Sequence, residues 1–157
     1  MIAVADTSPL NYLIQIDEID LLPALFGHLS LPQAVLQELQ HPKTPKRVQE
    51  WILHPPEWLA VRTVATTPNP ALMRLDLGER ETIQLALELN MNTVLIDETE
   101  GRRIAESLGL EVRGTLGILE RGAKLGRIDF RSALRKLEQT TFRISPVVRA
   151  AFLTRNP

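Results

Sequence analysis

The sequence predicts an α/β protein with three α/β/α layers, in which helices cover both faces of a mostly parallel central sheet. Short apolar segments that read as buried strands alternate with segments whose apolar residues have helical spacing. Such alternation is typical of parallel strands joined by crossover helices. The length of 157 residues and the hydrophobic fraction of 44% correspond to one globular domain. We therefore expect a single domain over residues 1–157, with a helical extension from about residue 129.

Five strands are expected, each followed by one or two helices. Residues 2–6 read as a buried strand, and residues 8–16 as a helix in which Ser8 is the N-cap and Pro9 the first helical residue. In the rest of the first half, helices are predicted over residues 19–26, 32–40 and 47–53, and strands over residues 28–31 and within residues 54–64. After a break at residues 66–70, helices are predicted over residues 78–90, 102–109, 116–126 and 127–139, and strands over residues 92–97 and 110–115.

The composition excludes several kinds of site. The chain has no cysteine, which rules out a disulfide framework, a thiolate metal site and a cysteine nucleophile, and favours a reducing cytosol. His28, His41 and His54 stand 13 residues apart and share no motif, so we interpret them as surface or loop residues. Because no segment has the apolar length of a membrane span and Asp6 interrupts the first apolar run, we expect a soluble, cytoplasmic protein without a membrane partner.

The net charge of −1 conceals an asymmetry along the chain. Residues 1–100 hold 14 acidic residues and 6 Lys or Arg, whereas residues 101–157 hold 5 acidic residues and 12 Lys or Arg. This pattern is compatible with an acidic metal centre beside a basic surface that binds phosphates. It is also compatible with basic residues that only solvate helices.

Two carboxylates follow predicted strands directly. Asp6 closes the apolar run IAVAD and Asp97 closes TVLID. Ligands of an open α/β sheet bind beyond the carboxyl ends of its strands, so both side chains are expected at the same edge. A structural alternative exists for each alone, because aspartate often caps a following helix.

Helical spacing adds further carboxylates. Glu38 shares an apolar stripe with Val35, and Glu79 lies four residues before Ile83 on the inward stripe of its helix. A carboxylate on such a face is costly unless it is paired or bound to metal. Glu81 lies on a more mixed stripe and ranks below Glu79, for which favourable placement at a helix N-terminus is the alternative.

Together these four acids predict a metal site for phosphoryl transfer to water. The expected catalytic residues are Asp6, Glu38, Glu79 and Asp97, of which Asp6, Glu79 and Asp97 are the metal ligands. Oxygen ligands without histidine or thiolate suit Mg²⁺ or Mn²⁺, which bind phosphate oxygens and help to deprotonate an attacking water. Ser8 is expected to orient a water molecule or the scissile phosphate.

Four blocks of the sequence, in their order and spacing, resemble PIN-domain proteins of the kind found among bacterial VapC-like toxins. They are DTSPLNYLIQI, LPQAVLQEL, LGERETIQLALEL and TVLIDETEGRRIAESLGLEVRGTLGIL, which together cover residues 1 to about 125. The resemblance implies a compact α/β sandwich, three or four acids that bind Mg²⁺ or Mn²⁺, and endoribonuclease activity. It also implies, for toxin members, a cognate antitoxin protein and a homodimer.

Carried over by position, the acids of the family fall on the same four residues, and the hydroxyl after the first aspartate falls on Ser8. The third acid is more usually aspartate, where this chain has Glu79. The sequence DETE at residues 97–100 also departs from the commoner toxin pattern, so that Glu98 or Glu100 is a further candidate to replace or supplement Asp97.

At least one of two arginines is expected to contact the RNA. Arg102 and Arg103 begin the helix that follows Asp97, and the repulsion between RNA and an acidic site has to be offset by cations at the flanking phosphates. One competing interpretation is a catalytically silent PIN module that binds RNA or a partner protein. Another is a phosphatase of the haloacid dehalogenase type, which needs a second aspartate at the position of Ser8.

Overall fold

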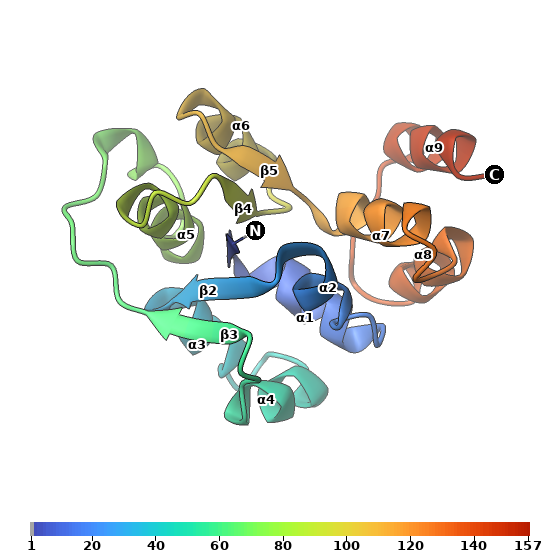
Figure 1. The fold of residues 1–157 in the computed structure, drawn as a ribbon, viewed down its shortest axis with the longest axis horizontal. Helices are drawn as coiled ribbons and strands as arrows, with labels where there is room; N and C mark the ends of the chain where they lie inside the picture. The colour runs from blue at the N-terminus through green and yellow to red at the C-terminus, as the bar shows by residue number, and fades with distance from the viewer. Residues whose placement is uncertain (1) are drawn as a thin grey trace.

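The central element of the fold is a five-stranded sheet (Figure 1). Every neighbouring pair of its strands is parallel. The structure is a computed structural model, and it describes residues 2–157. The strand order is β3-β2-β1-β4-β5. The strands are β1 (Ile2–Ala5), β2 (His28–Pro32), β3 (Leu59–Arg62), β4 (Thr93–Leu95) and β5 (Glu111–Arg113).

Helices pack on both faces of the sheet, which confirms the three-layer architecture predicted from the sequence. On one face, Val4 and Val94 contact α5 and α6, whereas Ala3 and Ala5 point to the other face and the remaining helices of the core. This division follows from the alternation of side chains along a strand. The helices of the sandwich are α1 (Thr7–Gln15), α2 (Leu21–Phe26), α3 (Gln33–Leu39), α4 (Lys46–Leu53), α5 (Leu77–Glu88), α6 (Thr99–Ser107) and α7 (Thr115–Lys124).

The order of the strands creates a crevice between β1 and β4. The chain winds outward from β1 through β2 to β3, and then returns through α5 to β4 on the other side of β1. The loops that leave β1 and β4 therefore diverge, and this point of divergence is where open α/β sheets bind ligands. Asp6 and Asp97 leave these two strands at the same edge, and the Asp6 amide donates a hydrogen bond to the Leu95 carbonyl at 2.9 Å.

The chain ends in two helices that pack beside α7 and project from the sandwich (Figure 1). They are α8 (Phe130–Glu138) and α9 (Pro146–Arg155). The Phe152 ring of α9 stacks on Phe130, with 5.9 Å between ring centroids, and the Arg155 guanidinium lies over Phe152. Every residue of α9 is at least partly exposed. We define residues 140–157, which comprise α9 and the segment before it, as the C-terminal arm.

The structure corrects two details of the sequence-based prediction. Helix α1 begins at Thr7, so that Asp6 and not Ser8 occupies the N-cap position. The sequence analysis also predicts no helix after residue 139, whereas α9 follows Ser145, whose side chain accepts a hydrogen bond from the Val148 amide. The break at residues 66–70 leads into a short 3₁₀ turn, η1 (Pro70–Leu72). Among residues 2–157, no helix is long and apolar enough to cross a membrane.

Candidate active site

Asp6 is a buried carboxylate at the end of β1. Only 6% of its surface is exposed. The pKa of Asp6 is raised to about 8, mainly by burial and also by the negative charges of Asp76, Glu38 and Glu79, whereas a hydrogen bond from the Thr7 amide opposes the shift. The side chain therefore lies in an environment that favours a proton or a cation beside it.

Glu79 is placed next to Asp6 by the first turn of α5. Asp76 is the N-cap of this helix, and its side chain accepts a hydrogen bond from the Glu79 amide at 2.9 Å. Glu79 is buried, and this burial raises its pKa to about 7, with further contributions from the charges of Asp76, Glu98 and Glu38. Acidic groups are favourable at the N-terminus of a helix. The first turn of α5 therefore places the carboxylates of Asp76 and Glu79 at this end of the crevice.

Glu38 reaches the cleft from the outside. Sequence spacing predicts it on the inward apolar stripe of α3, but the structure exposes its side chain at the rim, where Oε2 accepts a hydrogen bond from Thr7 Oγ1 at 2.5 Å. Gly78 permits this approach: a Cβ at residue 78 would lie 2.5 Å from Glu38 Oε1 and 3.2 Å from Asp6 Oδ1. The α5 backbone thus lies directly beneath both carboxylates because residue 78 has no side chain.

Asp97 is fixed by hydrogen bonds from two helices. Its Oδ2 accepts bonds from Ser8 Oγ at 2.8 Å and from Thr115 Oγ1 at 2.7 Å, and its Oδ1 accepts a bond from the Thr115 amide at 2.7 Å. The Ser8 hydroxyl is therefore engaged with Asp97. Its expected contact with a water molecule or phosphate stays a prediction.

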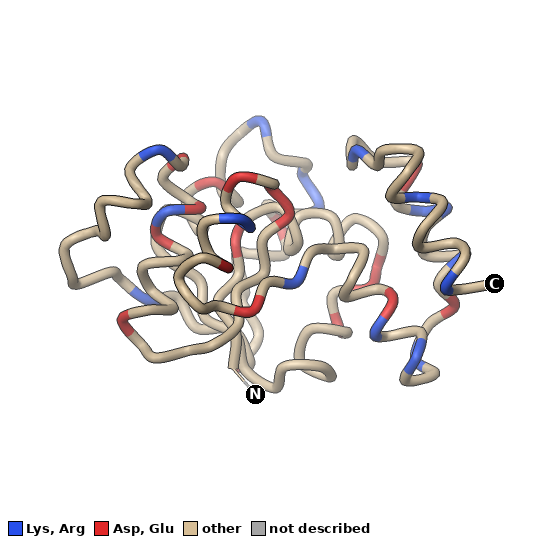
Figure 2. The backbone as a smooth tube through the Cα atoms, turned by 90° about the horizontal axis from the view of Figure 1, so that it is seen from above, with Lys and Arg blue, Asp and Glu red and all other residues tan. Residues whose placement is uncertain are grey.

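These carboxylates line one open cleft with a volume of about 620 Å³. Asn11 also lines it, and Asn11 Oδ1 is buried without a hydrogen-bond partner among the described residues. In Figure 2, Asp and Glu positions gather around the middle of the domain, whereas Lys and Arg are frequent along the C-terminal helices. The six acidic residues of the cleft are Asp6, Glu38, Asp76, Glu79, Asp97 and Glu98.

The remaining predicted residues lie in different places. Glu81 Oε1 accepts a hydrogen bond from the Ala34 amide at 3.1 Å and so caps the N-terminus of α3. Glu100 and Arg103 form an exposed ion pair with a 2.6 Å separation. Arg102 is partly buried beside Asp97, and its Nη1 donates to the Ile96 carbonyl at 3.1 Å. Of the two arginines, only Arg102 faces the side of the site that Asp97 occupies.

The cleft has the donor chemistry of a site for a hard divalent cation. Within residues 2–157, no three acidic or histidine side chains already stand close enough together to hold a metal ion. The donors nevertheless fit such an ion, because the cleft collects carboxylate oxygens and an unpartnered amide oxygen, and two of its carboxylates are buried with raised pKa values.

Sequence reasoning missed Asp76, Asn11 and Thr115. Asp76 could have been found from the sequence, because an aspartate followed three residues later by a glutamate, here Glu79, is typical of the start of a helix. Asn11 and Thr115 carry no such signal, because their roles depend on how α1 and α7 approach the sheet.

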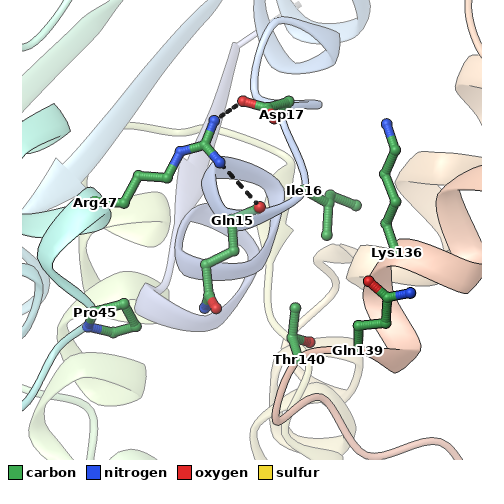
Figure 3. Close-up of a pocket in the computed structure, with 8 residues that line it drawn as sticks. All are labelled: Gln15, Ile16, Asp17, Pro45, Arg47, Lys136, Gln139 and Thr140. Carbon is green, nitrogen blue, oxygen red and sulfur yellow. Dashed lines mark hydrogen bonds and ion pairs between the residues drawn. The ribbon is translucent and has the colours of Figure 1, made fainter.

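A separate hollow of about 340 Å³ lies at the other end of α1, between α4 and α8 (Figure 3). In this hollow Arg47 pairs with Asp17 and donates a hydrogen bond to the Gln15 carbonyl, as the dashed lines in Figure 3 show. Its single carboxylate is thus already matched by a cation. The hollow lacks the group of carboxylates that the cleft at β1 and β4 provides.

Fold and site together define an α/β protein with a carboxylate-lined cleft at the switch point of a parallel sheet. The chain belongs to the PIN-domain family, whose model matches residues 2–156. PIN domains are commonly nucleases, and those nucleases usually use divalent metals. Comparison with curated proteins and with solved structures gave no match.

Proposed function

We propose that this protein is a divalent-metal-dependent endoribonuclease that hydrolyses RNA phosphodiester bonds in the cleft between β1 and β4. The observation that carries the proposal is the burial of Asp6 and Glu79 beside further carboxylates, which raises both pKa values. Such an arrangement is costly for a module that only binds a partner, because unpaired buried carboxylates destabilise the fold. A cation in the cleft would remove that cost.

In this proposal Asp6, Glu79 and Asp97 hold Mg²⁺ or Mn²⁺. The bound cation would stabilise charge on the phosphate oxygens and lower the pKa of a water molecule. Asp76 fixes the first turn of α5 and thereby the position of Glu79, while Ser8 and Thr115 orient Asp97. These contacts hold the acids in place before substrate arrives, which lowers the cost of organising the site.

Glu38 is the carboxylate that remains to take a proton. It is exposed at the rim, and its orientation is fixed by the Thr7 hydroxyl. When water attacks the phosphorus atom, its proton passes to Glu38. The bond between phosphorus and the leaving ribose oxygen breaks, and that oxygen takes a proton from solvent.

We also propose that the protein is the toxin of a toxin–antitoxin pair, acts in the cytoplasm and forms a homodimer. This part rests on the resemblance of its sequence blocks to VapC-like toxins. Expression of the wild type and of Asp6→Asn in a bacterial host tests the proposed toxin activity. Growth arrest by the wild type alone is expected, and equal growth of both strains would contradict it.

Cleavage of labelled RNA by wild type and Asp6→Asn tests the enzymatic proposal. Asp6→Asn keeps the shape of the side chain but removes its charge, so turnover is expected to fall by roughly 10²-fold or more. A chelator should abolish wild-type cleavage, and Mg²⁺ or Mn²⁺ should restore it. Cleavage that persists in chelator, or in Asp6→Asn, would rule the proposal out. A matched single-stranded DNA checks the preference for RNA.

A further inference from the structure

A second hollow of about 620 Å³ lies between the C-terminal arm and the β5–α7 corner. Its volume is in the range of small-ligand sites, which is about 300–1,000 Å³. Val112 and Leu116 form part of its wall on one side, and Phe142, Ile144 and Phe152 of the C-terminal arm face it from the other. The arm thus encloses a space that the sandwich alone would leave open.

This hollow adjoins the acidic cleft. Asp97 and Thr99 line both spaces, and so do Phe142 and Arg143 of the C-terminal arm. The segment that carries Phe142 is anchored to α1, because the Phe142 ring packs edge-on against Tyr12 with 5.0 Å between centroids. A chain-like ligand in the cleft can therefore continue past Asp97 into the hollow.

The charge of the hollow is opposite to that of the cleft. Arg102, Arg113 and Arg143 line it. Arg143 is exposed and takes part in none of the ion pairs among residues 2–157, and the contact of Arg113 with Glu111 is long, at 3.9 Å. Guanidinium groups bind phosphate through paired hydrogen bonds. Apolar and aromatic walls beside them suit a nucleobase, which single-strand binders hold by stacking.

Two glycines give the hollow its shape. A Cβ at Gly114 would lie 2.6 Å from Arg102 Nη1 and 3.0 Å from Asp97 Oδ1, so the absence of a side chain there lets the arginine and the acid approach the same backbone. At Gly117 a Cβ would meet no atom within 4 Å. The space above Gly117 is therefore open to a ligand.

From the continuity with Asp97 and the change of charge, we propose that the C-terminal arm completes a binding pocket for one nucleotide of single-stranded RNA, adjacent to the scissile phosphate. The base lies against the apolar wall and Phe142, and Arg102 and Arg143 contact the flanking phosphate. This inference rests on the proposed ribonuclease function, and it adds a substrate subsite that the acidic residues do not provide.

Two variants test the pocket by different means. Gly117→Phe fills the open space, and Arg143→Ala removes a phosphate contact. Arg149→Ala is the matched control, because Arg149 lies on the same arm but pairs with Glu138 at 2.8 Å and does not line the hollow. Each change is made in the full chain, alone and together with Asp6→Asn, and thermal unfolding reports whether each variant folds.

Binding of a fluorescently labelled single-stranded RNA of mixed sequence is measured with the Asp6→Asn forms, and KM and kcat with the active forms. Gly117→Phe and Arg143→Ala are each expected to weaken affinity by about tenfold, with a larger effect on KM than on kcat. Arg143→Ala should also reduce the salt dependence of binding by about 0.7 in slope. Arg149→Ala should leave the RNA affinity and its salt dependence unchanged.

Failure of the pocket and failure of the nuclease are distinguishable. If the wild type cleaves RNA and Arg143→Ala binds and cleaves as Arg149→Ala does, the pocket proposal is wrong, and an acidic segment of a partner protein is the alternative occupant. If the wild type does not cleave with either metal, the enzymatic proposal fails. Because Arg143 is exposed, Arg143→Ala is not expected to perturb folding. The test therefore holds even if Gly117→Phe does not fold.

Discussion

The Ser8 hydroxyl donates a hydrogen bond to Asp97 Oδ2 at 2.8 Å and so joins the first turn of α1 to the loop that follows β4. The two residues lie 89 positions apart in the chain. With the two bonds from Thr115, Asp97 accepts three hydrogen bonds, which fix both of its oxygens. The orientation of this carboxylate is thus built into the fold and does not depend on a bound ligand.

Ser8→Ala should therefore impair the site more than the fold. Loss of one hydrogen bond to a charged group is expected to lower the free energy of unfolding by about 1–2 kcal/mol. Groups that orient metal ligands typically change metal affinity or activity by about 10–100-fold, so cleavage should fall by that factor. Denaturant unfolding and cleavage rates at several Mn²⁺ concentrations provide the measurement.

Ser107→Ala is the control for Ser8→Ala. Ser107 Oγ donates to the Ile104 carbonyl at 2.6 Å at the end of α6, away from the carboxylates. This variant should lose less stability than Ser8→Ala, because the acceptor is a neutral carbonyl, and it should lose no activity. Equal cleavage by Ser8→Ala and Ser107→Ala would show that Ser8 does not position Asp97 for the reaction.

Gly78→Ala should also reduce cleavage while changing the stability of the fold little. The new methyl group would meet Glu38 Oε1 at 2.5 Å, but Glu38 is exposed and can rotate away. The free energy of unfolding is therefore expected to change by less than about 1 kcal/mol. Cleavage should fall about tenfold or more, because Glu38 leaves its position beside Asp6.

Gly117→Ala serves as the control for stability and metal affinity. Its Cβ meets nothing within 4 Å, so the change should raise helix stability by roughly 0.5–1 kcal/mol. The Cβ of Gly78→Ala would also lie 3.2 Å from Oδ1 of the proposed metal ligand Asp6. Calorimetric titration with Mn²⁺ should therefore show weaker binding for Gly78→Ala and wild-type binding for Gly117→Ala. Wild-type cleavage by Gly78→Ala would remove Glu38 from the mechanism.

The metal-free protein should become less stable as the pH rises. Burial, together with the charges of neighbouring acids, raises the pKa of Asp6 from 3.8 to about 8 and that of Glu79 from 4.5 to about 7. Between about pH 4 and pH 8 the folded state then binds more protons than the unfolded state, so the free energy of unfolding falls with pH, by a few kcal/mol as an order of magnitude. The stabilisation by the protonated acids is fully present below their pKa values in the unfolded state. It is lost as the pH rises through their pKa values in the folded state.

Denaturant unfolding at pH 5, 6, 7 and 8 in chelator measures this dependence. Asp6→Asn should reduce the slope and be more stable than the wild type at pH 8. Saturating Mg²⁺ should raise the stability of the wild type most at high pH, because the cation replaces the protons on these carboxylates. A metal-free wild type that gains stability from pH 5 to pH 8 would contradict the burial of two uncompensated acids.

The sequence could predict the sheet and its two strand-end acids because both depend on local patterns. Apolar runs that end in Asp6 and Asp97 indicate strands and their carboxyl edge without knowledge of any distant contact. Helix α9 escaped prediction because its residues are all at least partly exposed, so its apolar residues form no clear inward stripe.

Other parts of the site depend on tertiary contacts that no local pattern encodes. Serine is a common N-cap residue, but α1 begins at Thr7, two residues before the predicted start at Pro9, and the Ser8 hydroxyl donates to Asp97 instead of capping the helix. Glu38 is exposed, and α5 approaches it so closely at Gly78 that a Cβ there would lie 2.5 Å from Glu38 Oε1. The spacing along α3 indicates on which face of that helix Glu38 lies. It does not show how much of that face the neighbouring helix α5 covers.

Arg102 and Arg103 should differ in their contribution to RNA binding. Arg102 is partly buried beside Asp97 and lines the hollow of the C-terminal arm, whereas Arg103 pairs with Glu100 on the surface. A phosphate contact releases counterions, so loss of one contact should reduce the slope of log affinity against log salt by about 0.7 for a single strand. Arg102→Ala in the Asp6→Asn background should show this reduction.

Arg103→Ala is the matched control, because it removes the same charge from the same helix one residue further on. Its slope should equal that of the Asp6→Asn parent, since its guanidinium is already engaged with Glu100 at 2.6 Å. The measurement is fluorescence anisotropy with labelled single-stranded RNA at four or more salt concentrations. A slope for Arg102→Ala equal to that of the parent would show that Arg102 touches no phosphate. A reduced slope for Arg103→Ala alone would place the RNA on the outer face of α6 instead of beside Asp97.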